Sequence, residues 1–513
     1  MSGTGPGGDG PLIVPPLTDF TTAVSAASGG ELLDLGEHFV RRLADPEQLL
    51  ARAERLDTGR GTSADALRAL FARAAADALR RGRADRAALR ATGMALRLAG
   101  DADPALTLAV DDLELRDGTT ESAPATDTAA RRTRLFGPEV ELALRWAGDR
   151  AVRVLVDTDQ QLPAALALVR ALGPARVTLC GRFAWEHREV LGQLPSAAGA
   201  RFDPAVPART VRPGWLPGTE DVRWVTVPAE RTPGAPWLGW LDVVDAAASA
   251  DGHWARCRGL TVTVARLDSW ETAVGARGGR ADLAALCARL RPGTPLAVEL
   301  LVGAPGTDAK DAAAAVALIA DGPAPAPGVR PVLAGLRPFR LPRPSGGGRP
   351  PAGWDGVPLR PRPRPEHDLP RWTDFDAPGT LTPAERSGTI HALLGDLARD
   401  TDLYPGRLAG AAATAHAVGP PADGPPADGP PVWDPSARVA STARAAVDGK
   451  GPGTFVAHLR TGSAFRLHPR LVEVVTDLAD GGTDRLDRLS PATRTRLLGL
   501  LTRAGALAPG RTP

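Results

Sequence analysis

Strand-like and helix-like segments alternate along the chain from residue 150 onward, and this order constrains the fold more than any other feature. The predicted strands are residues 153–156 and 176–179, and the predicted helices are 161–172 and 185–194. Gly173 and Pro174 end the first of these helices. Such alternation produces parallel strands in one sheet covered by helices. The sequence therefore predicts an α/β fold, with residues 12–20 as a candidate first strand.

A second alternating block follows between residues 260 and 336. Its predicted strands are 260–265, 296–302 and 329–336, and its predicted helices are 280–290 and 308–319. The spacing fits either a doubly wound sheet or part of a β/α barrel.

The C-terminal part, residues 372–513, is predicted to be mainly helical. A strand pair at 454–458 and 464–467, followed by helices at 469–479 and 490–504, suits a small winged-helix-like module. The predicted division is an α/β domain at 1–228 with a helical insert and a linker at 117–133, a truncated barrel at 229–345, a Pro/Arg-rich linker at 346–371, and the C-terminal region.

Composition excludes several classes of function. Sixty-one basic and fifty-nine acidic residues leave a net charge of +2, which argues against a nucleic-acid partner. No stretch approaches the roughly 20 apolar residues of a membrane helix, and the N-terminus lacks the features of a secretory signal. We therefore expect a cytoplasmic protein with no membrane association.

Residues 152–195 resemble the cobalamin-binding half of cobalamin-dependent radical SAM enzymes. In that family a strand and a polar loop precede a helix that begins Gln-Leu, here at Gln161, and a second strand ends in a Gly-Gly pair. The resemblance implies a flavodoxin-like domain that binds cobalamin at its strand ends. The positions that match the cofactor loops are Asp157, Thr158, Gln160, Cys180 and Gly181. Cys180 stands where the family has glycine, so it adds a side chain where the backbone could approach closely.

Residues 260–319 resemble the late strands of a radical SAM barrel. The family has a strand that ends in Gly-x-Pro-Gly, and Gly303, Pro305 and Gly306 match this element. Such a turn exposes amides at the next helix N-terminus, where a nucleotide-like ligand can bind.

The family's cluster loop is missing. A radical SAM enzyme holds a [4Fe–4S] cluster with three cysteines in a Cys-x-x-x-Cys-x-x-Cys loop, and the fourth iron chelates S-adenosylmethionine. The whole chain has three cysteines, Cys180, Cys257 and Cys287, which lie far apart, and only Cys257 lies where the loop would be. The sequence thus predicts that no cluster forms and that S-adenosylmethionine finds no iron to bind.

These features predict a pseudoenzyme that acts as a non-catalytic partner or scaffold in natural-product or modified-peptide biosynthesis. Its partner would be a peptide substrate or an active radical SAM homologue, because the C-terminal module resembles the small peptide-binding modules found with modified-peptide maturases. The alternatives are an active cobalamin-dependent methyltransferase with an atypical or absent cluster, and an unrelated α/β protein.

Two further pairs have both a chemical and a structural interpretation. Cys180 with His187 could form a nucleophile and its base, or both could be buried packing residues. His253 with Cys257 could bind a metal, or could simply lie on one helix face. In both cases packing is the simpler explanation, so no catalytic or metal-binding residue is assigned.

Overall fold

The computed structural model forms two compact units. The first comprises Met1–Phe39 and Asp103–Val418, and the second comprises Val40–Ala102 and Gly419–Pro513. The structure describes residues 10–16, 31–81, 86–109, 112–204, 223–225, 236–243, 246, 251–264, 280–321, 328–342, 353–354, 356–362, 364, 367–370, 372–400, 432–459 and 461–507.

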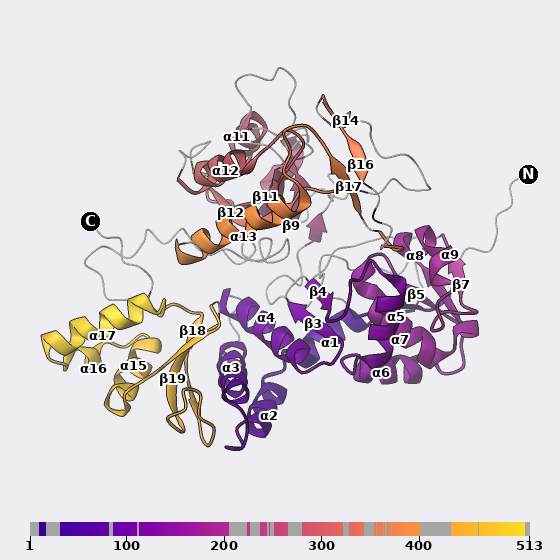
Figure 1. Ribbon diagram of the computed structural model, residues 1–513. Coiled ribbons are helices and arrows are strands. Elements are labelled where there is room, and N and C mark those ends of the chain that lie inside the picture. Colours follow the sequence, from indigo (N-terminus) through magenta and orange to yellow (C-terminus); the bar gives the residue numbers. More distant parts are fainter. Residues whose placement is uncertain are drawn as a thin grey trace, which may run out of the picture. The chain divides into compact units, whose positions relative to one another are not determined.

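A five-stranded parallel sheet lies in the first unit (Figure 1). Its strands are β1 (Leu12–Val14), β2 (Leu32–Asp34), β5 (Val152–Leu155), β6 (Val177–Cys180) and β7 (Arg201–Asp203), and all pair in parallel. Their spatial order is β2-β1-β5-β6-β7. The order changes direction at β1, so the gap between the carboxyl ends of β1 and β5 is the switch point where α/β sheets bind ligands. The predicted α/β fold with a parallel sheet is confirmed.

Three helices cover one face of this sheet, namely α5 (Ala123–Arg132), α6 (Gly137–Ala147) and α7 (Leu162–Leu172). Ile13, Val154 and Leu179 point into the core that these helices share. The other elements of this region are α1 (Leu35–Leu43), the hairpin β3 (Leu106–Ala109) and β4 (Asp112–Leu115), η1 (Asp159–Gln161), η2 (Pro174–Arg176), α8 (Arg182–Glu186) and α9 (Arg188–Leu191).

The expectation of a linker at 117–133 is wrong, because ten of these residues form α5. Ala123, Thr126, Ala129 and Ala130 are buried against the core of the sheet. Small side chains allow α5 and α7 to pack closely, and the same small, polar composition is what makes the segment look like a linker.

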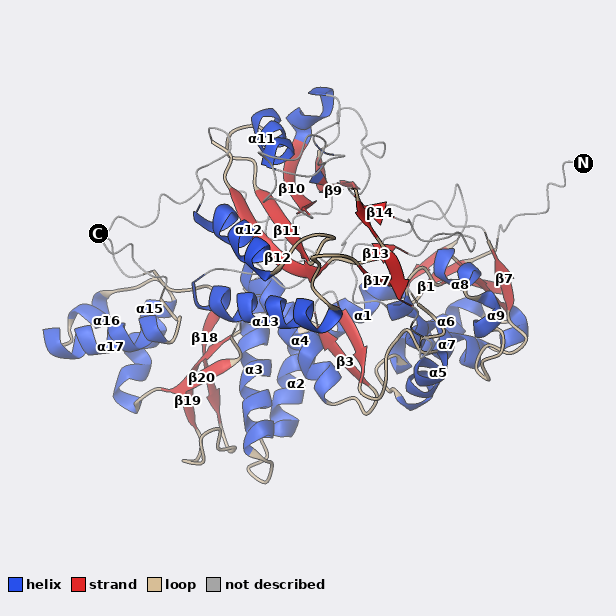
Figure 2. Ribbon diagram, turned by 45° about the horizontal axis from the view of Figure 1, so that its top comes forward, coloured by secondary structure: helices blue, strands red, loops and turns tan. Residues whose placement is uncertain are grey.

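A second five-stranded parallel sheet is built from consecutive strands. These are β8 (Arg223–Val225), β9 (Trp237–Asp242), β10 (Cys257–Val264), β11 (Leu296–Val302) and β12 (Pro331–Pro338), and η4 (Asp251–Arg256) precedes β10. Figure 2 shows α12 (Ala309–Asp321) beside β11 and β12. Together with α11 (Arg280–Arg289) and α13 (Pro383–Asp400) it forms one core on one face of the sheet. The strands and helices predicted between 260 and 336 are present within a few residues of their predicted bounds.

Short strands connect the second sheet to α13. They are β13 (Leu341–Pro342), β14 (Gly353–Trp354), β15 (Val357–Pro358), β16 (Arg360–Arg362) and β17 (Trp372–Asp376). The segment expected to be a linker at 346–371 therefore contains strands, and its Leu359 and Leu369 are buried. The many prolines and arginines around these two leucines are typical of a linker, so the sequence does not reveal that the leucines are buried.

The second unit has an antiparallel sheet with helices on both faces. Its strands are β18 (Ala437–Thr442), β19 (Gly453–His458) and β20 (Ser463–Arg466), in that spatial order. Phe455 and Ala457 pack against α2 (Pro46–Leu56), α3 (Ser63–Arg80) and α4 (Arg86–Asp101). Val456, from the opposite face, packs against η6 (Pro469–Leu471), α15 (Val472–Ala479), α16 (Asp484–Asp487) and α17 (Pro491–Arg503).

The predicted strand pair and the two helices after it are thus present in the second unit. The predicted domain boundaries differ from the observed units, because residues 40–102 and 419–513 share one unit. None of the helices in the described part of the chain is long and apolar enough to cross a membrane.

Candidate functional site

The predicted cofactor residues of the first sheet lie at the carboxyl ends of neighbouring strands. Asp157, Thr158 and Gln160 follow β5, and Cys180 and Gly181 stand at the end of β6. The amide of Arg182 donates to Asp157 Oδ1 at 3.2 Å, and the amide of Val156 donates to the Cys180 carbonyl at 2.7 Å. The structure therefore brings the residues after β5 and the residues at the end of β6 together beside the switch point of the sheet.

Gly181 has a structural reason to be glycine. Its φ is +103°, and a Cβ at this position would lie 2.6 Å from the Val156 carbonyl oxygen. The same carbonyl accepts a hydrogen bond from the amide of Ala184 at 3.0 Å, which fixes the start of α8. The group that lies close to this glycine is therefore the backbone carbonyl of Val156, not a ligand placed by the fold.

Cys180 lies in an environment that disfavours a reactive thiolate. Its side chain is fully buried, and Sγ lies 3.6 Å from the Val154 carbonyl oxygen. Burial raises the pKa of the Cys180 thiol to about 12. A thiol with so high a pKa carries almost no thiolate at neutral pH, which disfavours a nucleophilic role. The ring of His187 packs against Phe183, with 4.4 Å between the ring centroids.

Side chains from earlier in the sequence cover the loop after β5. Gln160 Nε2 donates to Asp112 Oδ1 at 2.8 Å, and the Thr120 hydroxyl donates to the Asp159 carboxylate. Burial raises the pKa of Asp112, and the nearby Glu114 adds to this rise. Only 8% of Thr158 and 6% of Asp159 remain exposed, so this loop offers little surface to a ligand.

Two amide atoms of the glutamine side chains in the same loop lack a partner among the described residues. Gln161 Oε1 accepts hydrogen bonds from the amides of Asp157 and Thr158, at 2.7 and 3.3 Å. Among the described residues, however, Gln161 Nε2 and Gln160 Oε1 are buried without a hydrogen bond. Such atoms usually contact water or a polar ligand.

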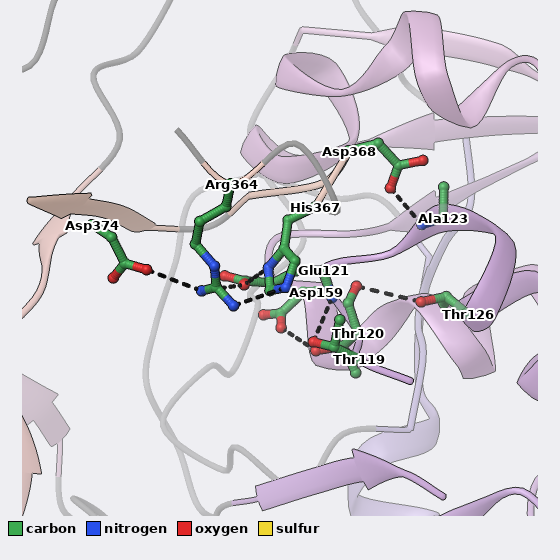
Figure 3. Close-up of polar contacts among 10 residues, drawn as sticks. All are labelled: Thr119, Thr120, Glu121, Ala123, Thr126, Asp159, Arg364, His367, Asp368 and Asp374. Atoms are coloured by element: carbon green, nitrogen blue, oxygen red, sulfur yellow. Dashed lines mark hydrogen bonds and ion pairs between the residues drawn. The ribbon is translucent and has the colours of Figure 1, made fainter. Parts of the chain in front are cut away.

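Four charged or ionisable residues next to this loop form what we call the Glu121 cluster: Glu121, Arg364, His367 and Asp374 (Figure 3). Glu121 Oε2 bonds to His367 Nδ1 and lies 3.3 Å from Arg364 Nη1. Arg364 Nη2 lies 2.8 Å from His367 Nε2, and its Nη1 lies 3.4 Å from Asp374 Oδ2. The cluster joins the turn before α5 to β17 and to the residues that precede β17.

Hydrogen-bond chemistry fixes the tautomer of His367. A guanidinium can only donate, so His367 Nε2 must accept from Arg364. The proton of the neutral imidazole is then on Nδ1, where it is donated to Glu121. The nitrogen that would act as a general base is therefore occupied by Arg364, which points to a structural role for the cluster.

Two residues next to His367, Asp368 and Leu369, form hydrogen bonds at the start of α5. Asp368 Oδ1 accepts from the amide of Ala123 at 2.7 Å, whereas Ser122, at the N-cap of α5, makes no side-chain capping bond. The amide of Leu369 donates to the Glu121 carbonyl at 2.9 Å, and its side chain is buried in the core of the first sheet. Asp368 thus caps α5 from a distant part of the sequence.

The second predicted loop, with Gly303, Pro305 and Gly306, joins β11 to α12. Its two glycines have φ of +78° and +76°. The amide of Gly306 donates to Thr380 Oγ1 at 2.7 Å, and a Cβ on Gly303 would lie 2.7 Å from Arg386 Nε. Arg386 is itself buried, and burial lowers the pKa of its guanidinium. Thr380, just before α13, and Arg386, in its first turn, therefore cover this loop.

A carboxylate already caps the helix that follows this loop. Asp308 Oδ1 accepts from the amides of Lys310 and Asp311, at 2.7 and 3.0 Å. The hydrogen bonds from these two amides lower the pKa of Asp308, so it is charged at neutral pH. A second anion, such as a nucleotide phosphate, would meet this negative charge at the N-terminus of α12.

The three cysteines lie on separate elements, in β6, β10 and α11, and all are buried. No group of three His, Cys, Asp or Glu side chains in the described stretches is placed to hold a metal ion. The side chain of His253, which the sequence paired with Cys257, lies outside the described part.

No protein-family model, curated protein or solved structure matches this chain. The resemblance to cobalamin-dependent radical SAM enzymes therefore rests on the sequence motifs and stays a prediction.

Sequence reasoning missed the Glu121 cluster altogether. Glu121 lies in the segment expected to be one linker, and Arg364 and His367 lie in the other. The one sequence signal was the order His-Asp-Leu at 367–369, which places two polar groups beside an apolar anchor in a proline-rich stretch. Nothing local connects this triplet with a carboxylate 246 residues away.

Proposed function

We propose that this chain is a non-catalytic partner protein of modified-peptide or natural-product biosynthesis, with the frame of a cobalamin-dependent radical SAM enzyme. One observation carries the proposal. Both strand-end loops that would hold the cofactors pack against the chain's own side chains, Asp112 and Thr120 at the first loop and Thr380 and Arg386 at the second.

Strand order supports a flavodoxin-like assignment for the first sheet. Counted within that sheet alone, the order β2-β1-β5-β6-β7 becomes 2-1-3-4-5, which is the flavodoxin-like order. In the second sheet, consecutive parallel strands are neighbours and helices cover one face, as in part of a β/α barrel. These two topologies, in this sequence order, support the proposal.

Cysteine placement supports the loss of cluster chemistry. The sequence has no Cys-x-x-x-Cys-x-x-Cys loop, and the three thiols of the chain are separately buried. Without three converging thiolates, a [4Fe–4S] cluster would have no protein ligands. The cluster that reduces S-adenosylmethionine in this family would then be absent.

An active cobalamin-dependent transferase is the second candidate, and the unpartnered amide atoms of Gln160 and Gln161 favour it. They lie beside the switch point, where a corrin with its many amide groups would find hydrogen-bonding partners. Hydroxocobalamin bands that survive desalting, together with methyl transfer, would favour this candidate over a non-catalytic partner.

The second unit supports a peptide as the partner. Three antiparallel strands followed by helices suit the winged-helix-like, peptide-binding module that the sequence predicts. β20 ends the sheet, and no described strand pairs with its outer edge. An edge strand can take up an extended peptide as an additional strand, because its outward amides and carbonyls are open for pairing.

Displayed random peptides, selected on the full chain, test this function. Hydrogen exchange of Ser463–Arg466 should slow when a selected peptide binds, because new inter-strand hydrogen bonds protect the β20 amides. The control is the same peptide with prolines at alternate positions, which cannot form a strand ladder. Failure to select any binding peptide, or protection located away from the second unit, would contradict the proposal.

A further inference from the structure

The outward face of α17 combines positive charge with an exposed apolar side chain. Arg496, Leu500 and Arg503 are spaced four and three residues apart, so they lie on one face of the helix. All three are exposed, and 46% of the Leu500 surface is open to solvent. A Cβ on Gly499 would lie 3.6 Å from Arg503 Nη1, so this guanidinium lies over the preceding turn of the helix.

Among the described residues, no acidic side chain pairs with the two arginines of this face. The sequence of α17, PATRTRLLGLLTR, contains no acidic residue. Within the described part of the chain, Arg496 and Arg503 make no ion pair or hydrogen bond, whereas Arg494 on the same helix pairs with Asp487 at 2.8 Å. On a neighbouring helix, Arg485 likewise pairs with Glu473.

We propose that this face of α17 selects a partner peptide that carries acidic residues next to an apolar side chain. Carboxylates would pair with Arg496 and Arg503, and the apolar side chain would cover Leu500 between them. The two guanidiniums offer planar donors that fit carboxylates, and their charge would speed encounter with an acidic peptide. This inference rests on the proposed peptide-binding function and adds the chemical character of the peptide.

Three fluorescein-labelled peptides of equal length test it on the full chain by anisotropy. The first combines glutamate and leucine, the second replaces each glutamate with lysine, and the third replaces each leucine with serine. We expect the first to bind at least about tenfold more tightly than the other two, and its affinity to fall with added salt.

Substitutions then locate the binding face. The double variant Arg496→Gln with Arg503→Gln should weaken binding of the glutamate–leucine peptide about tenfold, and Leu500→Ser should weaken it several-fold. Arg485→Gln is the matched control, because it removes one positive charge from a residue that already has an internal partner. All these positions are exposed, and unchanged circular dichroism of each variant would verify folding.

Two results would overturn the inference and leave the peptide-binding function intact. One is equal binding of the lysine and glutamate peptides. The other is a double variant that binds as tightly as Arg485→Gln. If none of the peptides, including those selected by display, binds the chain at all, then the proposed function fails together with this inference.

Discussion

Substituting Gly181 by alanine should destabilise the first parallel sheet by about 3 kcal/mol in the absence of any cofactor. Two costs contribute: a left-handed φ of +103°, worth about 1–2 kcal/mol for a residue with a Cβ, and overlap with the Val156 carbonyl oxygen at 2.6 Å, worth about 1–3 kcal/mol. Denaturant titration with hydrogen exchange of β5 and β6 measures the loss.

Gly173→Ala is the matched control for this variant. Its φ is +90°, similar to that of Gly181, but a Cβ there would meet nothing within 4 Å. Only the backbone cost of about 1–2 kcal/mol should therefore remain. Equal stability of the two variants would contradict the close approach of β5 and β6, and would restore the view that Gly181 makes room for a cofactor.

Substituting Asp57 by alanine should destabilise the second unit by about 3–5 kcal/mol. Asp57 is 4% exposed and accepts hydrogen bonds from the amides of Ala443 and Arg444, at 2.7 and 2.9 Å, and from the amide of Ala445. Arg73 Nη2 lies 2.7 Å from the same carboxylate. Alanine would leave three amides and a guanidinium without their acceptor. Hydrogen exchange of the β18 amides measures the resulting loss of stability.

The pH dependence of this effect has a definite sign. Burial raises the pKa of Asp57, but the hydrogen bonds from the three amides and from Arg73 outweigh it, so the pKa is lowered. The stabilisation is therefore complete above the unfolded-state pKa of about 3.9 and is lost as the pH falls through the folded-state value. The difference between wild type and Asp57→Ala should shrink below about pH 4.

Asp480→Ala is the control for the removal of an ion pair. Its carboxylate is 58% exposed and pairs with Arg81 at 3.2 Å, so its loss should cost less than about 1 kcal/mol. If Asp57→Ala is no more destabilising than Asp480→Ala, the anchoring of residues 443–445 by Asp57 is contradicted.

The regular strands and helices were predictable because their signals are local. β5, α7, β6, β11 and α12 each have their own apolar pattern and turn residues, and a parallel α/β arrangement follows from their order. The strand-end position of Asp157–Gln160 and Cys180–Gly181 was predictable for the same reason, since parallel strands place their carboxyl ends at one edge.

The side chains that cover those strand ends were not predictable, because they come from distant parts of the sequence. Thr120 reaches Asp159 from 39 residues away, and Thr380 reaches Gly306 from 74 residues away. Asp368 caps α5 across 245 residues, so the side chain that caps this helix comes from a distant segment. Contacts of this kind depend on the folded chain, and periodicity carries no information about them.

The iron content of the desalted protein after anaerobic incubation with iron and sulfide tests the central claim most directly. The closed strand-end loops and the three separate, buried thiols predict iron at the background level of a protein without cysteine ligands. About four iron atoms per chain, with the visible absorption of a [4Fe–4S] cluster, would contradict the account and identify an active radical SAM centre.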